Sequence, residues 1–66
     1  MQAIQSPPQI AVGKIKSFGA LGPKYEVGEA IRQLEDGDWL VKIKMVETGE
    51  IAEYRLSRMV DDPEAR

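Results

Sequence analysis

Apolar and polar side chains alternate along two neighbouring segments, residues 39–45 and 52–56. Such alternation places one kind of side chain on each face of an extended chain, and it therefore predicts two β-strands. A turn centred on Thr48-Gly49 joins the strands into a hairpin. The expected cross-strand pairs are Met45 with Ala52, Ile43 with Tyr54, Val41 with Leu56, Val46 with Ile51, Lys44 with Glu53, and Lys42 with Arg55.

The dipeptide Asp36-Gly37 predicts a second hairpin immediately upstream. Both central positions of a type I′ turn need positive φ, and Asp-Gly is a favoured pair for that turn. In this register Leu34 faces Trp39, which places the only tryptophan in the apolar core. The same register predicts a cross-strand charge ladder in which one lysine lies between two glutamates: Lys44, Glu29 and Glu53.

An alternative for residues 28–35 is one short helix that ends at Gly37. The residues of this segment are good helix formers, and Ile31 and Leu34 share a helical face. A helix of about eight residues is marginal in water, however, and the charge ladder favours a strand. The strand is therefore the leading prediction and the helix, which would make the fold α+β, is the alternative.

The chain upstream adds further short strands, one over residues 10–18 and one starting at Tyr25, separated by the glycine-rich loop "GALGP". About five strands in one small domain predict an all-β fold, an antiparallel meander that closes into an SH3-like barrel and so removes exposed strand edges. The expected organisation is a flexible arm at 1–8, a β domain at 9–60 and a frayed tail at 61–66.

Composition narrows the chemistry. The 66 residues include no cysteine and no histidine, so disulfides and the usual zinc ligand sets are excluded, and we expect no cofactor. No apolar run approaches the roughly 20 residues that cross a bilayer. The N-terminus lacks the features of a secretory signal, and we expect a cytoplasmic protein.

The segments "FGALGPKYEVG", "LEDGDWLVKI" and "TGEIAEYRLS", together with "DDPEA", carry a resemblance that spans most of residues 13–65. In these segments the chain is similar to a family of short bacterial proteins of unknown function. The resemblance implies a bacterial source. It implies no activity, cofactor or site residue.

Catalysis has no support in the residues. The common activated nucleophiles and bases are missing with cysteine and histidine, so we expect no enzyme activity. The acidic residues around Gly37 lack the spacing of a Ca²⁺ loop and fit a solvated turn. The stretch "GALGPK" lacks the spacing and the hydroxyl residue of a phosphate-binding P-loop, and it fits a tight connection.

Apolar and basic side chains on the polar face of the main hairpin point to binding instead. We expect a non-catalytic protein-interaction or regulatory module that contacts a protein partner or a second copy of the chain. The candidate contact residues are Leu40, Lys42, Val46, Ile51 and Arg55. The alternative is a nucleic-acid-binding accessory protein that uses the basic sheet face, although an isoelectric point near 5.0 is low for that class.

Overall fold

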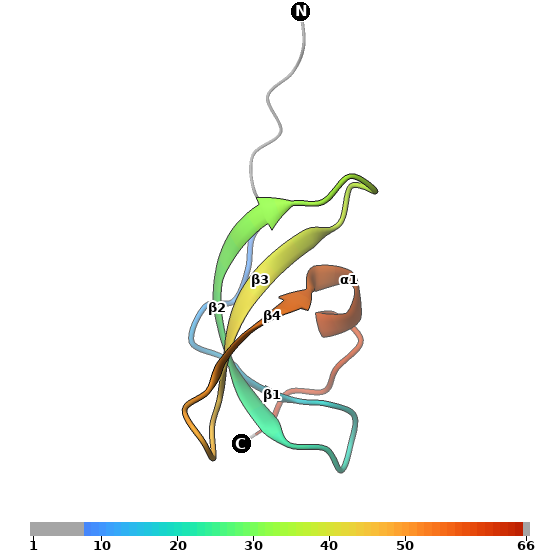
Figure 1. The fold of residues 1–66 in the computed structure, drawn as a ribbon. Coiled ribbons are helices and arrows are strands. Elements are labelled where there is room, and N and C mark those ends of the chain that lie inside the picture. The colour runs from blue at the N-terminus through green and yellow to red at the C-terminus, as the bar shows by residue number, and fades with distance from the viewer. Residues whose placement is uncertain (1–7, 66) are drawn as a thin grey trace, which may run out of the picture.

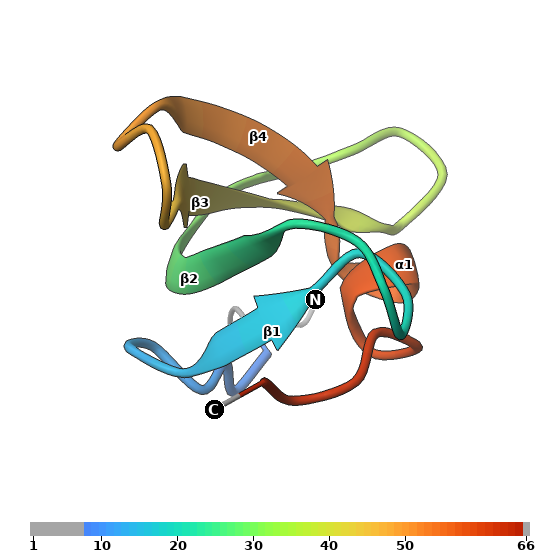
Figure 2. The same cartoon turned by 90° about the horizontal axis from the view of Figure 1, so that it is seen from below.

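Four strands and one helical turn make up the fold. In a computed structural model, which describes residues 8–65, they are β1 (Ile15–Ser17), β2 (Lys24–Gln33), β3 (Trp39–Met45), β4 (Ile51–Arg55) and α1 (Leu56–Met59). The strands form one antiparallel sheet in the order β1-β2-β3-β4, and Figures 1 and 2 show this meander from two sides. The predicted meander is confirmed. The alternative helix at 28–35 is wrong, because β2 continues to Gln33 and pairs with β3.

Closure of the sheet into an SH3-like barrel is not confirmed. Within residues 8–65, β1 and β4 are the outer strands, and they do not pair with each other. After β4 the chain turns through α1 and returns to the outer edge of β1 (Figure 2). The predicted arm at 1–8 lies, apart from Pro8, outside the described residues.

The segment after α1 is attached to β1, whereas the sequence predicts that residues 61–66 fray. The Ser17 amide donates to the Pro63 carbonyl at 3.1 Å, and the Ala65 amide donates to the Ile15 carbonyl at 2.8 Å. These bonds satisfy backbone groups at an edge of β1 that would otherwise face water. Residues 63–65 therefore lie along the outer edge of β1, where Glu64 forms an isolated bridge with Lys16.

The β3–β4 hairpin forms as predicted, but its register is shifted by two residues. Val41 lies opposite Tyr54 rather than Leu56. The cause is a longer loop, closed by a 2.8 Å bond from the Gly49 amide to the Met45 carbonyl, in which Gly49 has a φ of 74°. A two-residue type I′ turn would need positive φ at Thr48 as well, and β-branched residues avoid it. A shift by two keeps each side chain on its predicted face.

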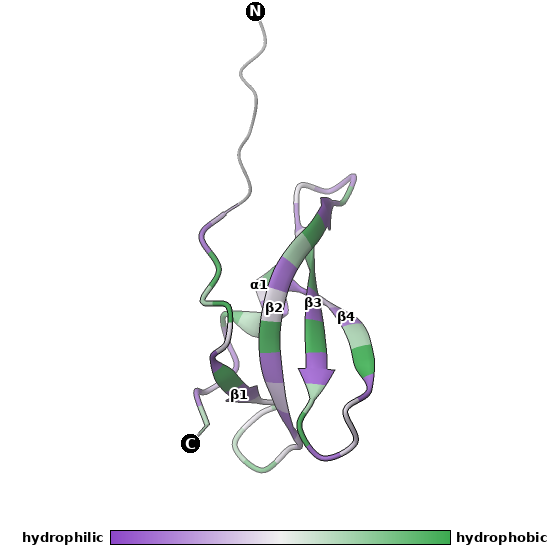
Figure 3. Cartoon of the chain, turned by 90° about the vertical axis from the view of Figure 1, so that its left-hand side faces the viewer, coloured by the Kyte–Doolittle hydropathy of each residue, from purple (hydrophilic) through white to green (hydrophobic). Residues whose placement is uncertain are grey.

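The β2–β3 pairing is irregular, which alternation alone does not reveal. Val27 lies opposite Ile43 and Ala30 lies opposite Val41, so β2 contains one residue more than β3 between these pairs. The predicted pairing of Leu34 with Trp39 is wrong, because Gln33 occupies that position. Hydrophobic and hydrophilic bands still follow each other along β2 (Figure 3).

The core lies between one face of the sheet and α1. Its buried members are Tyr25, Val27, Val41, Ile43 and Met59, and the half-buried side chains packed against them are Ile10, Phe18, Met45, Tyr54 and Leu56. Trp39 is half-buried and outside this core, so the prediction that it is a core residue is wrong. The tip of the β2–β3 hairpin extends past α1, as Figure 1 shows.

Candidate protein interface

The sheet face opposite the core, here called the outer face, collects most of the predicted contact residues. On β3 and β4 the register sets Leu40 opposite Arg55, Lys42 opposite Glu53 and Lys44 opposite Ile51. Four of the five candidates, Leu40, Lys42, Ile51 and Arg55, therefore share one face of the hairpin. The fifth, Val46, lies in the β3–β4 loop with half of its surface exposed, rather than opposite Ile51.

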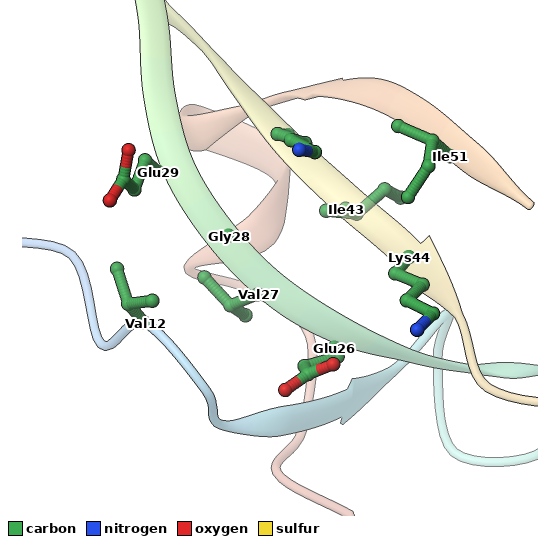
Figure 4. A pocket seen from close by; sticks show the side chains of 9 residues that line it. Val12, Glu26, Val27, Gly28, Glu29, Ile43, Lys44 and Ile51 are labelled. Atoms are coloured by element: carbon green, nitrogen blue, oxygen red, sulfur yellow. The ribbon is translucent and has the colours of Figure 1, made fainter. Parts of the chain in front are cut away.

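A groove of about 500 Å³ opens on the outer face. Val12 and Ile51 form its apolar sides, and both are more than half exposed. In Figure 4, Glu26 and Glu29 of β2 lie on the side of Val12, and Lys44 of β3 lies on the side of Ile51. The charged lining residues are Glu26, Glu29, Lys42 and Lys44. The groove thus joins an apolar contact to charges of both signs.

Gly28 leaves room at the floor of this groove. A Cβ atom at Gly28 would lie 2.8 Å from the Lys42 carbonyl oxygen, closer than real contacts allow. Only glycine lets β2 approach β3 this closely at the irregular part of their pairing. A larger residue at position 28 would therefore meet the backbone of Lys42 beside the groove.

Acidic and basic side chains alternate across the strands of the outer face. Glu26 lies opposite Lys44, and Lys42 lies opposite Glu53. The predicted charge ladder of Lys44 between Glu29 and Glu53 is therefore wrong. Because the β2–β3 and β3–β4 registers both differ from the predicted ones, Lys44 lies between Glu26 and Ile51. The physical principle holds, since cross-strand neighbours of opposite charge stabilise a sheet by a few tenths of a kcal/mol.

Arg55 lies on the outer face, but its guanidinium is engaged by the β2–β3 turn. Its Nη1 atom is 2.7 Å from Asp36 Oδ2 and 3.4 Å from Asp38 Oδ2. The hydrogen bond from Arg55 holds the pKa of Asp36 below its usual range, and the Ser57 hydroxyl does the same for the pKa of Asp38. Asp38 also accepts from the Ser57 amide at 3.1 Å. These contacts hold the start of α1 against the β2–β3 turn, and they pair the guanidinium of Arg55 with two carboxylates.

An aromatic cluster on the opposite face holds the returning chain. The Phe18 ring centroid lies 4.7 Å from that of Tyr25 and 5.0 Å from that of Tyr54. Both tyrosine hydroxyls donate to the Asp62 carboxylate, at 2.7 Å from Tyr25 and 3.0 Å from Tyr54. Burial and the adjacent carboxylate raise the pKa of Tyr25, and burial raises the pKa of Tyr54. Lys16 Nζ donates to the Met59 carbonyl at 2.6 Å beside them.

Several of these residues were not singled out from the sequence. No sequence pattern marks Val12 as a groove residue, because it reaches the groove from a segment far from β3 and β4 in the chain. Gly28 interrupts an alternating strand, which is a recognised mark of a bulge or of close backbone approach. Asp62 resembles a solvated turn residue in sequence, and only the tertiary structure places it against two tyrosines.

The described residues contain few other features of a site. No group of three or more histidine, cysteine or acidic side chains within residues 8–65 is arranged to hold a metal ion. Over the same residues, no helix has the length and apolar character needed to cross a membrane.

The fold and the outer face define a small β-rich protein built on an open four-stranded meander with a mixed apolar and charged groove. Residues 3–66 match the profile described as Family of unknown function (DUF5397), and the chain belongs to this family. The chain is also 51% identical over 57 residues to an uncharacterized protein of Haemophilus influenzae strain Rd, an alignment that covers 86% of this chain and 90% of that protein. The predicted resemblance to a bacterial family of unknown function is confirmed at this level.

Proposed function

We propose that this protein is a non-catalytic interaction module of the bacterial cytoplasm, which binds another protein through its outer face. The observation that carries the proposal is the groove between Val12 and Ile51, in which exposed aliphatic side chains adjoin two carboxylates and two ammonium groups. An aliphatic side chain of a partner would displace water from these walls, and flanking charges would fix its orientation.

The mixture of charges favours a protein over other partners. Glu26 and Glu29 line the same groove as Lys42 and Lys44, so the groove has no single sign of potential. Protein surfaces carry both signs and match such a pattern, whereas the nucleic-acid backbone is uniformly negative. The absence of cysteine and histidine from the chain supports binding rather than catalysis.

The alternative, a nucleic-acid-binding accessory protein, has support from Lys42 and Lys44 on one strand. It has less support than a protein partner, because each lysine faces a glutamate across the sheet and Arg55 is engaged by two aspartates. Titration with single-stranded and duplex oligonucleotides at low and physiological salt tests it. Binding that weakens steeply with salt would favour this alternative.

Affinity capture with matched surface variants tests the proposed function. The immobilised chain is incubated with a lysate of the native bacterium, and retained proteins are quantified by mass spectrometry. We expect Val12→Asp and Ile51→Asp to lower retention of the specific partner by about tenfold or more, because each places a charge in a desolvated contact.

The matched control is Leu21→Asp, which makes the same kind of change at a residue that is 99% exposed and outside the groove. It should retain the partner as the unaltered chain does, and circular dichroism establishes that all variants are folded. Equal retention by the groove variants and the control would contradict the proposal.

A further inference from the structure

The outer edge of β4 is open, in contrast to the outer edge of β1. The returning segment around Glu64 covers β1, whereas no strand within residues 8–65 lies beyond β4 (Figure 2). An uncovered edge presents backbone donors and acceptors to solvent and can pair with another extended chain.

The hydrogen-bond pattern shows which groups of β4 face outward. The Met45 amide donates to the Glu50 carbonyl at 2.8 Å, which marks a position in the ladder where β3 and β4 direct backbone groups towards each other. Such positions alternate along an antiparallel ladder, which makes Ala52 and Tyr54 the next residues of β4 bonded to β3. The backbone N–H and C=O groups of Ile51 and Glu53 therefore point away from β3.

Side chains at this edge lack two common forms of protection against strand addition. β4 contains no proline and no lysine, the residues that often blunt such edges. Ile51 at its start is 55% exposed and also lines the groove. The positive charge at the end of β4, Arg55, is turned towards Asp36 and Asp38.

The charge order across the sheet indicates what an added strand would carry. Glu53 has Lys42 on one side, and the position on its other side is open. A lysine or arginine there would place Glu53 between two cations and continue the alternation of charge. An aliphatic residue two positions away would lie against Ile51 and extend the apolar side of the groove.

We propose that an extended segment of another protein adds antiparallel to β4, with a basic residue opposite Glu53 and an aliphatic residue opposite Ile51. Strand addition would be the way in which the outer face binds a protein partner, and it therefore rests on the proposed function. Backbone bonds to Ile51 and Glu53 hold the segment, and its side chains at these two positions provide selectivity.

A second copy of the chain fits this edge poorly. Symmetric antiparallel pairing centred on Glu53 would set that carboxylate against its own copy. Pairing centred on Ala52 would set Ile51 against the glutamate of the other copy. Pairing centred on Tyr54 would set Glu53 against Arg55 of the other copy, but that guanidinium is bonded to Asp36 and Asp38, and Ile51 would meet Ser57 of α1 rather than an aliphatic residue. None of these arrangements gives both complementary contacts. A different chain with an aliphatic and a basic residue does.

The test uses a synthetic peptide, acetyl-TITKTIT-amide, titrated to millimolar concentration into the ¹⁵N-labelled full chain. We expect the amide signals of Ile51 and Glu53 to shift and their exchange with solvent to slow. A peptide with glutamate in place of lysine should bind about tenfold more weakly, and Glu53→Lys should reverse this preference, because attraction becomes repulsion.

N-methylation of the peptide separates strand addition from side-chain docking alone. Methyl groups on the lysine amide and on the following isoleucine amide block donors that face β4, and they should abolish binding. Methyl groups on the threonine amides point away from β4 and should leave binding unchanged. Equal effects of the two modifications would overturn the proposal, as would unshifted signals of Ile51 and Glu53 at millimolar peptide.

Two further results concern other occupants of the β4 edge and distinguish failure of strand addition from failure of the proposed function. β4 signals that shift with protein concentration, without peptide, would make a second copy the occupant and overturn the proposal. Capture that depends on Val12 and Ile51 while the peptide fails to bind would leave the proposed function standing and remove strand addition. Peptide binding together with unchanged capture by the groove variants would leave strand addition standing and remove the proposed function.

Discussion

Replacing Asp62 by alanine removes the acceptor that joins the returning chain to the aromatic cluster. The carboxylate accepts hydrogen bonds from Tyr25 at 2.7 Å and from Tyr54 at 3.0 Å. Tyr25 is fully buried, so its hydroxyl would lose its partner where water has little access. The neighbouring Asp61 is exposed and serves as the matched control.

The expected loss of stability is about 2–3 kcal/mol. Hydrogen bonds to charged groups contribute about 1.5–3 kcal/mol each, and the half-exposed position of Asp62 places each bond at or below the lower end of that range. A domain of this length has a free energy of unfolding of only about 3–10 kcal/mol. Asp62→Ala is therefore expected to bring the protein close to the limit of stable folding.

Urea denaturation followed by Trp39 fluorescence and far-ultraviolet circular dichroism measures this effect. With an m-value of about 1 kcal/mol per molar urea, the midpoint should fall by about 2–3 M. Asp61→Ala should change the free energy of unfolding by less than about 0.5 kcal/mol. A double-mutant cycle between Tyr25→Phe and Asp62→Ala should give a coupling energy of about 1 kcal/mol or more. Equal midpoints for the two aspartate variants, or no coupling, would refute the reasoning.

Three more predictions concern stability. Because the pKa values of Tyr25 and Tyr54 are raised in the folded protein, the unfolded chain loses these protons at a lower pH. The stability that the two protonated hydroxyl groups contribute is therefore fully present below about pH 10 and is lost as the pH rises above it. Denaturant titrations between pH 9 and 11 should show this loss, and a Tyr25→Phe variant should show a smaller slope. Trp39→Ala should cost less than about 1.5 kcal/mol, because Trp39 lies outside the core; a urea midpoint that indicates 3 kcal/mol or more would restore it to the core. Gly28→Ala should cost about 1–3 kcal/mol by thermal or urea unfolding, because its Cβ meets the Lys42 carbonyl, and unchanged stability would contradict that contact.

Alternation in the sequence was sufficient to predict β3 and β4 and their faces, whereas the strand predicted over residues 10–18 is only Ile15–Ser17 and the expected five strands are four. Val41 and Ile43 are buried and Lys42 and Lys44 are exposed, as a period of two requires. Alternation could not predict which residues of β3 and β4 lie opposite each other, because the length of the loop between the strands sets the register. One glycine that adopts positive φ, Gly49, closes a longer loop than the turn expected from its neighbours.

The candidate site could be predicted only in part for a related reason. Residues on one hairpin, such as Lys42 and Ile51, come together through local pairing that the sequence reveals. Val12 reaches the same groove from a segment far away in the chain. Arg55 was expected to be available for a partner, but it lies beside Asp36 because the two hairpins meet there. Contacts of this kind depend on the assembled sheet and leave no local pattern.

The attachment of residues 61–65 to β1 has a consequence for the order of folding. The two hairpins formed by residues 24–55 close through nearby residues, and they can form early. The bond from Lys16 to Met59 and the bonds of β1 to Pro63 and Ala65 join parts of the chain more than 40 residues apart. Closing so long a loop costs entropy that local pairing does not, which makes this the late step. Until this late step, the outer edge of β1 stays uncovered.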